Sequence, residues 1–390
     1  MEIFRDSKEH LLLVLYSIFK LMKAILIVLA FALISCEETA KVIVPATLTN
    51  NPMQSKMDSA VQKAFADNLE KIDSPGISIG ILKDGKTTFY GYGETARGNG
   101  IVPGENTFFE IGSITKTFTA ITVTEMLLNE EKEIETAIKS YLPSDLPTLQ
   151  RGGVEVTFKH LLTHTSGMPR MPNNYSSIEK YEGYSQEKLY QYLYNVQLES
   201  TPFTTFNYSN TGFGILGNIL ERHYKMSYNE LIADRLLNPL NLKDTKVKFE
   251  DTDPNRWAKG YSKGEEAEYW KSMNAMNGAG VIKSTAKDLL AYANANLSPP
   301  DNTLGQAIKL THQKAFGETN RDGGLAWVLT APNQKSGKRI WWHNGGTGGF
   351  TSWLFINEEK ESALVILFNS SMDNGPGAEF IDVLLKITAE

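Results

Sequence analysis

A serine and a lysine lie three residues apart in residues 110–119, which read Glu-Ile-Gly-Ser-Ile-Thr-Lys-Thr-Phe-Thr. If this segment is helical, the Ser113 hydroxyl and the Lys116 amine project from the same face, because three residues make nearly one turn. A neutral lysine there can accept the serine proton, which predicts a nucleophile with its own base. The spacing alone is weak evidence, since it recurs by chance, usually as a helix-start serine beside a solvated lysine.

The residues that follow Ser113 indicate that the helix is buried. For about three turns they are mostly apolar or threonine, and the apolar ones are Phe118, Ala120, Ile121, Val123, Met126, Leu127 and Leu128. A lysine at the start of a buried helix is costly unless it is paired or deprotonated. The pattern therefore favours a chemical role for Lys116.

Two further clusters carry a phenol, an amide and an imidazole. Residues 206–212, Phe-Asn-Tyr-Ser-Asn-Thr-Gly, contain Tyr208 and Asn210 in a loop-like stretch before an apolar run. Residues 341–350, Trp-Trp-His-Asn-Gly-Gly-Thr-Gly-Gly-Phe, contain His343 on a predicted strand. Taken separately, each has an ordinary explanation as a helix cap with a packed aromatic, a core imidazole, or a glycine turn.

Taken together and in this order, the three motifs resemble those of the serine β-lactamase and penicillin-recognising DD-peptidase superfamily, specifically its class C β-lactamase-like branch. The resemblance covers roughly residues 56–385. Two connecting segments also look like family signatures: residues 156–167, Val-Thr-Phe-Lys-His-Leu-Leu-Thr-His-Thr-Ser-Gly, and residues 278–289, Gly-Ala-Gly-Val-Ile-Lys-Ser-Thr-Ala-Lys-Asp-Leu. Five motifs in one order leave little room for coincidence.

The resemblance implies acyl transfer through a covalent intermediate on Ser113. Lys116 and the Tyr208 phenol would share the proton transfers, and no cofactor is needed. Asn210 would hold Lys116 or the amide of the substrate. The backbone N–H groups of Ser113 and Gly346 would form the oxyanion hole, where donors act on charge that develops in the transition state.

The strand with His343, Gly345 and Gly346 is expected to bind the substrate, and its glycines let the strand edge lie close to a peptide. The β-lactamases mostly carry Lys-Thr-Gly where this chain has His-Asn-Gly. Because an imidazole is mostly neutral near neutral pH, it holds a carboxylate less firmly than an ammonium does. If His343 contacts a carboxylate in its protonated form, turnover should fall as the pH rises through the imidazole pKa.

Three functions remain open at this point. The first is a DD-peptidase or β-lactamase that acts on D-alanyl peptides or their β-lactam mimics. The second is an esterase or D-amino-acid amidase on the same scaffold, since His-x-Gly also occurs in the family's DD-carboxypeptidases, D-aminopeptidases and esterases. The third is a non-catalytic penicillin-binding protein, which the complete set of Ser113, Lys116, Tyr208 and Asn210 disfavours.

Strand patterns near both ends of the chain predict an α/β (α+β) fold. A helix near residues 57–69 precedes strands at residues 76–82 and 87–92 joined by Asp-Gly, and strands at 325–329, 340–343, 351–356 and 363–368 precede a helix at 380–387. We therefore expect one antiparallel sheet built from both chain ends, flanked by helices, with a mostly helical insertion. The predicted hydrolase domain is 56–387, with an α/β part at 56–112 plus 270–387 and a helical part at 113–269.

Three competing motifs have weaker support. Gly-Ile-Ser-Ile-Gly at residues 76–80 fits the nucleophile elbow of α/β-hydrolases at Ser78, but strand alternation continues through Ser78 and no helix follows. His160 and His164 have a metal-like spacing, yet no glutamate follows His160 and no third ligand is evident. The glycines after His343 lack the Lys-Ser/Thr of a phosphate loop. We therefore predict no metal site.

Composition narrows the partners. The chain has 390 residues, 41% of them hydrophobic, and a net charge of −6. That length is sufficient for one large domain of two parts or for two smaller domains. The absence of a basic run argues against nucleic acid as a partner. We expect a small-molecule or peptide substrate instead, such as a peptidoglycan stem peptide, a β-lactam or an ester.

The N-terminal region resembles a bacterial lipoprotein signal. From Met22 the chain has a short basic start, an apolar core and then Leu-Ile-Ser-Cys, which ends at Cys36, the only cysteine in the sequence. We expect residues 1–35 to be the signal peptide and 36–55 a lipid-anchored tether, which places the enzyme in the bacterial cell envelope, facing the periplasm or the surface. Because the signal is complete from Met22, we expect Met22 to be the true start of the protein and residues 1–21 to result from an upstream start codon assigned in error.

Replacing the cysteine tests this anchor. Cys36→Ser should move the protein from the membrane fraction to the soluble fraction, because lipid chains on this residue are the proposed anchor. Fractionation with immunodetection measures the shift. A variant that stays in the membrane after a salt wash would instead indicate that the N-terminal apolar stretch is an uncleaved anchor.

Overall fold

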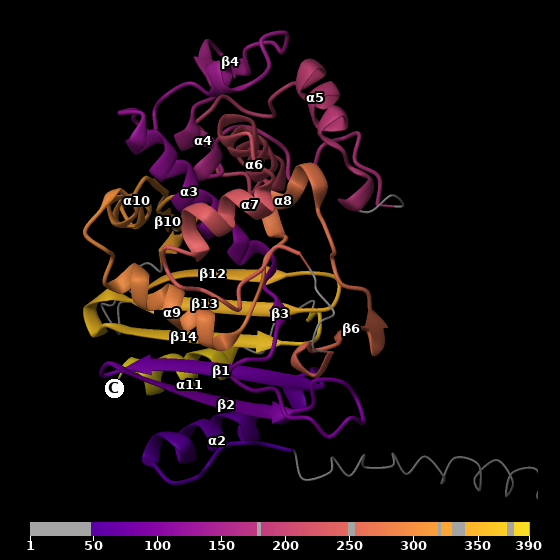
Figure 1. Cartoon of the computed structure of the whole chain (residues 1–390), viewed down its shortest axis with the longest axis vertical. Coiled ribbons are helices and arrows are strands. Elements are labelled where there is room, and N and C mark those ends of the chain that lie inside the picture. Colours follow the sequence, from indigo (N-terminus) through magenta and orange to yellow (C-terminus); the bar gives the residue numbers. More distant parts are fainter. Residues whose placement is uncertain are drawn as a thin grey trace, which may run out of the picture. The chain divides into compact units, whose positions relative to one another are not determined.

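The structure is a computed structural model that describes residues 48–177, 181–248, 254–318, 321–329, 340–372 and 378–389. The centre of this part of the chain is an eight-stranded antiparallel sheet in the order β2-β1-β14-β13-β12-β11-β10-β9 (Figure 1). Its strands are β1 (Gly76–Lys83), β2 (Lys86–Gly93), β9 (Phe316–Glu318), β10 (Arg321–Gly323), β11 (Val328–Leu329), β12 (Trp341–Gly346), β13 (Thr351–Asn357) and β14 (Ser362–Phe368). The sheet joins both ends of the chain, as predicted.

The predicted hairpin and the pairing of the chain ends are both confirmed. Strands β1 and β2 pair with Lys83 opposite Lys86, and the Asp84-Gly85 turn between them has φ values of 51° and 70°. Both turn residues have the positive φ that a two-residue hairpin turn needs. On its other edge β1 pairs with β14, with Ile77 opposite Phe368. This pairing brings strands from opposite ends of the sequence side by side.

Helices cover both faces of the sheet (Figure 1). On one face, α2 (Lys56–Asn68) and α11 (Ala378–Ala389) share an apolar cluster with Ile77, Ile79 and Ile81 of β1. On the other face, α9 (Ala286–Leu297) packs against β1, β13 and β14. Residues 76–82 of β1 are all buried, as expected of a strand that is covered on both faces.

A mostly helical part lies beside the β12 side of the sheet (Figure 1). Its helices are α3 (Thr115–Asn129), α4 (Phe158–Leu162), α5 (Gln186–Asn195), α6 (Asn210–Tyr224), α7 (Tyr228–Ile232), α8 (Asn277–Gly280) and α10 (Thr303–Thr311). Residues 115–127 of α3 are all buried, which confirms the predicted buried helix. Helix α8 packs against α6 and α10 against α3, so segments far apart in sequence enclose α3.

Short elements connect these parts. The short strands are β3 (Phe109–Glu110) paired with β8 (Lys283–Ser284), β4 (Gln150–Arg151) with β5 (Val154–Glu155), and β6 (Gly260–Ser262) with β7 (Glu265–Ala267). Single helical turns are η1 (Leu69–Lys71), η2 (Gly112–Ile114), η3 (Ile138–Tyr141), η4 (Tyr181–Gly183), η5 (Ala233–Leu237), η6 (Pro254–Arg256), η7 (Asn274–Met276) and η8 (Glu358–Lys360). Among them, η2 carries the predicted nucleophile.

The predicted strand at residues 325–329 is shorter in the structure, where β11 contains only Val328 and Leu329. Ala326 has a φ of 64°, outside the extended region. Its amide donates to the carbonyl of Leu162 at 2.8 Å, away from the sheet. This residue therefore breaks the strand and ties the chain to α4.

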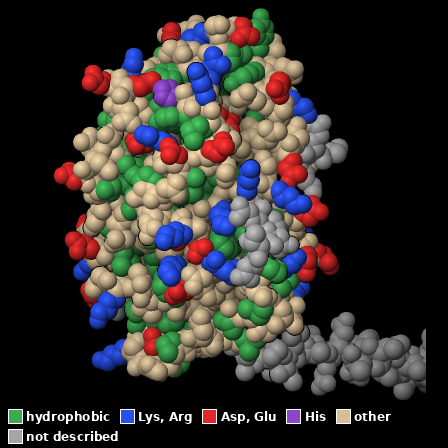
Figure 2. All heavy atoms as spheres, viewed as in Figure 1, with side chains coloured by type: hydrophobic (Ala, Val, Ile, Leu, Met, Phe, Trp, Pro, Cys, Tyr) green, Lys and Arg blue, Asp and Glu red, His purple; other side chains and the backbone are tan. Residues whose placement is uncertain are grey.

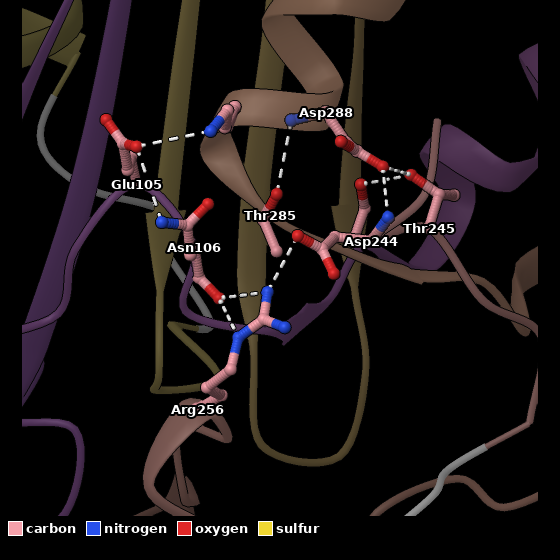
Figure 3. Close-up of polar contacts among 9 residues, drawn as sticks. Glu105, Asn106, Asp244, Thr245, Arg256, Thr285 and Asp288 are labelled. Atoms are coloured by element: carbon pink, nitrogen blue, oxygen red, sulfur yellow. Dashed lines mark hydrogen bonds and ion pairs between the residues drawn. The ribbon is translucent and has the colours of Figure 1, made fainter. Parts of the chain in front are cut away.

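A polar network fastens α9 to two loops (Figure 3). Arg256 pairs with Asp244 at 2.7 Å and also donates to the backbone carbonyl of Asn106. Thr245 donates to Asp288 of α9 at 2.9 Å. These bonds connect the segment before β3, which leads into η2, with the start of α9, which follows β8.

Part of the predicted tether is ordered. The carbonyl of Leu48 accepts from the amide of Gly93 at 2.7 Å, and Thr49 bridges Tyr92. Residues 48–50 therefore lie along β2 and are part of the folded domain. Cys36, the predicted signal peptide and tether residues 36–47 lie outside the described residues.

Over the described ranges, no helix combines the length and the apolar character needed to cross a membrane. Acidic and basic side chains are interspersed on the face that Figure 2 shows.

Candidate active site

The Ser113–Lys116 pair has the geometry of a nucleophile and its base. Ser113 lies in η2, and Lys116 is in the first turn of α3, so the chain is helical across the pair as predicted. Lys116 Nζ lies 3.0 Å from Ser113 Oγ and 2.6 Å from the carbonyl oxygen of Ala279 in α8. An amine that donates one N–H to a carbonyl keeps its lone pair for the serine proton.

The surroundings of Lys116 favour its neutral form. The side chain is completely buried, and this burial lowers its pKa well below the ordinary lysine value, with the positive charge of Arg170 as a second cause. The described residues include no carboxylate that pairs with Lys116. Desolvation disfavours the charged form of an amine, so Lys116 can act as a base near neutral pH.

Tyr208 completes the group around the nucleophile. Lys116 Nζ lies 5.0 Å from the centroid of the Tyr208 ring, and the phenol hydrogen-bonds with Ser113. Burial raises the pKa of Tyr208 to about 12, while the Ser113 hydrogen bond and the charge of Arg170 act in the opposite direction. The phenol is therefore protonated at ordinary pH and can donate a proton within the site.

The start of α6 fixes Tyr208 in place. Ser209, and not Tyr208 or Asn210, caps the helix, because its hydroxyl accepts from the amide of Gly212 at 3.0 Å. The same hydroxyl donates to the carbonyl of Pro169 at 2.8 Å. Tyr208 immediately precedes this doubly bonded residue, so its backbone position is set by the cap.

Asn210 does not have the contact that the resemblance implies with Lys116. Its side-chain amide donates to the sulfur of Met171 at 3.5 Å. The carbonyl of Ala279 instead accepts the hydrogen bond from Lys116. Of the two roles expected for Asn210, the contact with the amide of the substrate remains a prediction.

The glycines of β12 lie against the turn that holds the nucleophile. A Cβ on Gly345 would come within 2.0 Å of the carbonyl oxygen of Ile111, so no other residue fits there. Gly112 has a φ of +48°, and a Cβ on it would lie 2.8 Å from the amide nitrogen of Gly346. This close approach brings the Gly346 amide beside Ser113, where the predicted oxyanion hole requires it.

His343 is neutral in this structure. Its ring is almost fully buried, and Nδ1 lies 2.6 Å from the carbonyl oxygen of Asn344, so Nδ1 carries the proton. Burial lowers the pKa of His343 to about 3, with the charge of Lys116 as a second cause and the hydrogen bond to Asn344 acting against them. A protonated His343 that grips a carboxylate is therefore not supported by the geometry.

His164 belongs to the site, although its spacing from His160 suggested only loop structure. Its ring packs against that of Tyr208 in a tilted arrangement, with centroids 4.3 Å apart, and its Nδ1 accepts from the amide of Ser209 at 3.0 Å. The neutral ring thus carries its proton on Nε2, which has no hydrogen-bond partner among the described residues. Stacking against a residue 44 positions later leaves no signal in the sequence.

His160 has a separate structural role. The amide of Thr157 donates to its Nδ1 at 3.1 Å, and the pair forms a capping box at the start of α4. No group of three potential metal ligands occurs in the described ranges. His160 therefore lies in α4, whereas the sequence interpretation placed it in a loop, and His164 lies in the turn after that helix and lines the site.

A cavity of about 760 Å³ opens onto Ser113. Its lining includes Tyr208, His164, His343 and Gly346, together with an aromatic group that spacing could not identify: Phe206, Phe316, Trp327 and Trp342. Arg170 and Asp322 also line it, and Asp322 pairs with Lys314 at 2.8 Å. The predicted residues Ser113, Tyr208, His343 and Gly346 are therefore brought together, with Lys116 directly behind them.

Ser78 is not part of this site. It is fully buried in β1, and its hydroxyl donates to the carbonyl of Gly104 at 3.1 Å. Strand β1 continues to Lys83, so the sharp strand-to-helix turn of a nucleophile elbow is missing at this position.

Comparison with known proteins agrees with this geometry. The family model described as Beta-lactamase matches residues 61–386. A β-lactamase of Lysobacter lactamgenus is 26% identical over 361 residues, which cover 82% of this chain and 89% of that protein. A solved β-lactamase/D-alanine carboxypeptidase of Pseudomonas syringae superposes with a TM-score of 0.74 at 25% identity, over 85% of this chain and 98% of that one.

A class C β-lactamase of Rhodobacter sphaeroides has the same fold, with a TM-score of 0.73 at 22% identity over 84% of this chain and 99% of that structure. The family model spans most of the sequence and contains all three catalytic motifs. The chain therefore belongs to the β-lactamase family of serine hydrolases.

Proposed function

We propose that this serine hydrolase forms an acyl-enzyme on Ser113 with D-alanyl peptides or their β-lactam mimics. The observation that carries the proposal is the 3.0 Å contact between Ser113 Oγ and Lys116 Nζ, an amine whose burial lowers its pKa well below the ordinary lysine value. A free amine next to a serine hydroxyl is an arrangement that activates the nucleophile.

Each step has a group in position. Lys116 accepts the proton as Ser113 Oγ attacks the substrate carbonyl, and the amides of Ser113 and Gly346 stabilise the oxyanion. The Tyr208 phenol, whose pKa is raised to about 12, donates a proton to the leaving nitrogen and recovers one through Lys116. Water then attacks the ester carbonyl, and the same groups return the proton to Ser113.

Two findings support the substrate class. The Pseudomonas syringae structure has a name that joins β-lactamase and D-alanine carboxypeptidase activities, and it covers 85% of this chain. The cavity beside Ser113 is also large enough for a drug-sized or short peptide substrate, at about 760 Å³.

An esterase or D-amino-acid amidase is the second candidate, and a specific observation favours it. His343 is neutral, and one wall of the cavity is aromatic, with Phe206 and Phe316 ring centroids 5.8 Å apart. Such a wall suits an apolar acyl group. Turnover of nitrocefin, a D-Ala-D-Ala peptide and a p-nitrophenyl ester separates the two candidates by their relative kcat/KM values.

A location in the cell envelope fits the same proposal. A lipid on Cys36 would hold the enzyme at a membrane surface beside peptidoglycan, the source of D-alanyl peptides. A non-catalytic penicillin-binding role would not require Lys116 to be buried at a cost in solvation next to Ser113.

Covalent labelling tests the nucleophile. Ser113→Ala should abolish labelling by a fluorescent penicillin or a fluorophosphonate, because Ser113 is the one serine among the described residues that line this cavity, and it contacts a lysine. Ser78→Ala is the matched control and should label normally, since Ser78 is buried in β1. Loss of labelling in folded Ser78→Ala, with Ser113→Ala unaffected, would contradict the assignment.

Two further variants test the proton route. Lys116→Ala and Tyr208→Phe should each slow acylation by about two to four orders of magnitude, the range for loss of positioned acid-base help. Stopped-flow acylation measures the effect. Tyr292→Phe is a suitable control, because Tyr292 is also a buried phenol near α3 but hydrogen-bonds with Thr117, at 3.0 Å, and with Asn296, and it is not part of the cavity lining. Near-wild-type acylation in both site variants would refute the route.

A further inference from the structure

The cavity has an unusual distribution of charge. Of the described residues that line it, Arg170 and Asp322 are the ones with a permanently charged side chain. The Asp322 carboxylate already has a cation, Lys314, at 2.8 Å. Among the described residues, no carboxylate forms an ion pair with Arg170, so within this part of the chain Arg170 is the cation that the cavity lining offers to a ligand.

The other basic groups near Ser113 cannot serve as cations. Lys116 is completely buried and committed to Ser113 and Ala279. His343 and His164 are buried rings whose Nδ1 atoms are already bonded to backbone groups. A negatively charged substrate group therefore finds no cationic contact in these three residues.

The backbone of Arg170 is held firmly beside the nucleophile. Its carbonyl accepts from the amides of Asn210 and Thr211, at 2.9 and 3.3 Å, at the start of α6. The guanidinium lies 5.0 Å from the centroid of the Tyr208 ring, and the side chain is exposed to solvent. A cation at this distance is attracted by the ring, and the exposed guanidinium can be reached by a ligand in the cavity.

We propose that Arg170 binds the carboxylate of an anionic substrate and so selects for substrates that carry one close to the bond that is cleaved. A guanidinium matches a carboxylate with two parallel hydrogen bonds, which a neutral imidazole at His343 cannot provide. The inference rests on the proposed acyl transfer, and it assigns the carboxylate contact to the Tyr208 side of the cavity in place of β12.

The position of Arg170 has a second, measurable consequence. Its charge contributes to the lowered pKa of Lys116 and acts against the raised pKa of Tyr208. Removing the charge raises the pKa of Lys116, so a higher pH is needed to keep the amine neutral. In a plot of the acylation rate against pH, the rise on the acidic side should then move to higher pH; this rise is called the acid limb below.

The test compares one depsipeptide that ends in a free carboxylate with the same depsipeptide as its methyl ester. In Arg170→Gln, kcat/KM for the acid relative to the ester should fall about ten- to hundredfold, the range for one charge-assisted contact. Arg170→Lys keeps the charge but lacks the planar guanidinium that donates two parallel hydrogen bonds. Its acid-to-ester ratio of kcat/KM should therefore fall less, and its acid limb should stay at the wild-type pH.

Arg97→Gln is the matched control. Arg97 is also exposed and lies 4.9 Å from an aromatic centroid, that of Tyr261, but it is not part of the cavity lining. The ratio of kcat/KM for the acid to kcat/KM for the methyl ester should be the same in Arg97→Gln as in the wild type. An unchanged ratio in Arg170→Gln, with Ser113 still labelled by fluorophosphonate, would overturn the inference. A wild-type protein that neither labels nor turns over either substrate would instead overturn the proposed acyl transfer.

Discussion

Burial of the Lys116 amine is the constraint on which the site depends. An ammonium without a partner carboxylate is costly to remove from water, and the protein avoids that cost by holding the neutral amine. Two neighbours accommodate this form, the Ser113 hydroxyl at 3.0 Å and the Ala279 carbonyl at 2.6 Å. Desolvation by burial disfavours the charged form of Lys116, and the neutral amine that results can act as a base.

The fold encloses that amine with segments from distant parts of the sequence. Helix α8 supplies the carbonyl, the loop before α6 supplies Tyr208, and β12 closes the nucleophile turn through the contact between Gly112 and Gly346. Each of these approaches depends on a local feature, such as a glycine without a Cβ or the Ser209 cap. Precise placement of catalytic groups therefore follows from backbone packing more than from side-chain hydrogen bonds to Lys116.

Much of the fold could be predicted because its signals are local. The Asp84-Gly85 turn, the mostly apolar strands β1, β13 and β14, and the buried α3 are all specified by short-range patterns. The shortened β11 could not be foreseen, since the positive φ of Ala326 comes with a long-range hydrogen bond to Leu162. The short strand pairs β4–β5 and β6–β7 were not predicted either, and β6 contacts the chain next to β14 through Tyr261 and Asn369.

The site residues likewise fall into those with a local signal in the sequence and those without one. Ser113, Lys116, Tyr208 and His343 were predicted from motif spacing, whereas His164, Arg170 and the aromatic wall lie in the site only through tertiary contacts. The roles of two residues also needed the structure. Ala279 provides the contact with Lys116 that was expected of Asn210, and burial keeps His343 neutral, a state that its residue type leaves open.

The most direct measurement is the protonation state of Lys116 itself. Nitrogen-15 NMR of the lysine side chains, with the Lys116 signal assigned by its loss in a variant, reports whether the amine is charged. The structure predicts that the amine loses its proton well below the ordinary lysine pKa of about 10.4. A Lys116 signal that remains that of an ammonium up to about pH 10 would contradict the account, because the proposed base would then be absent.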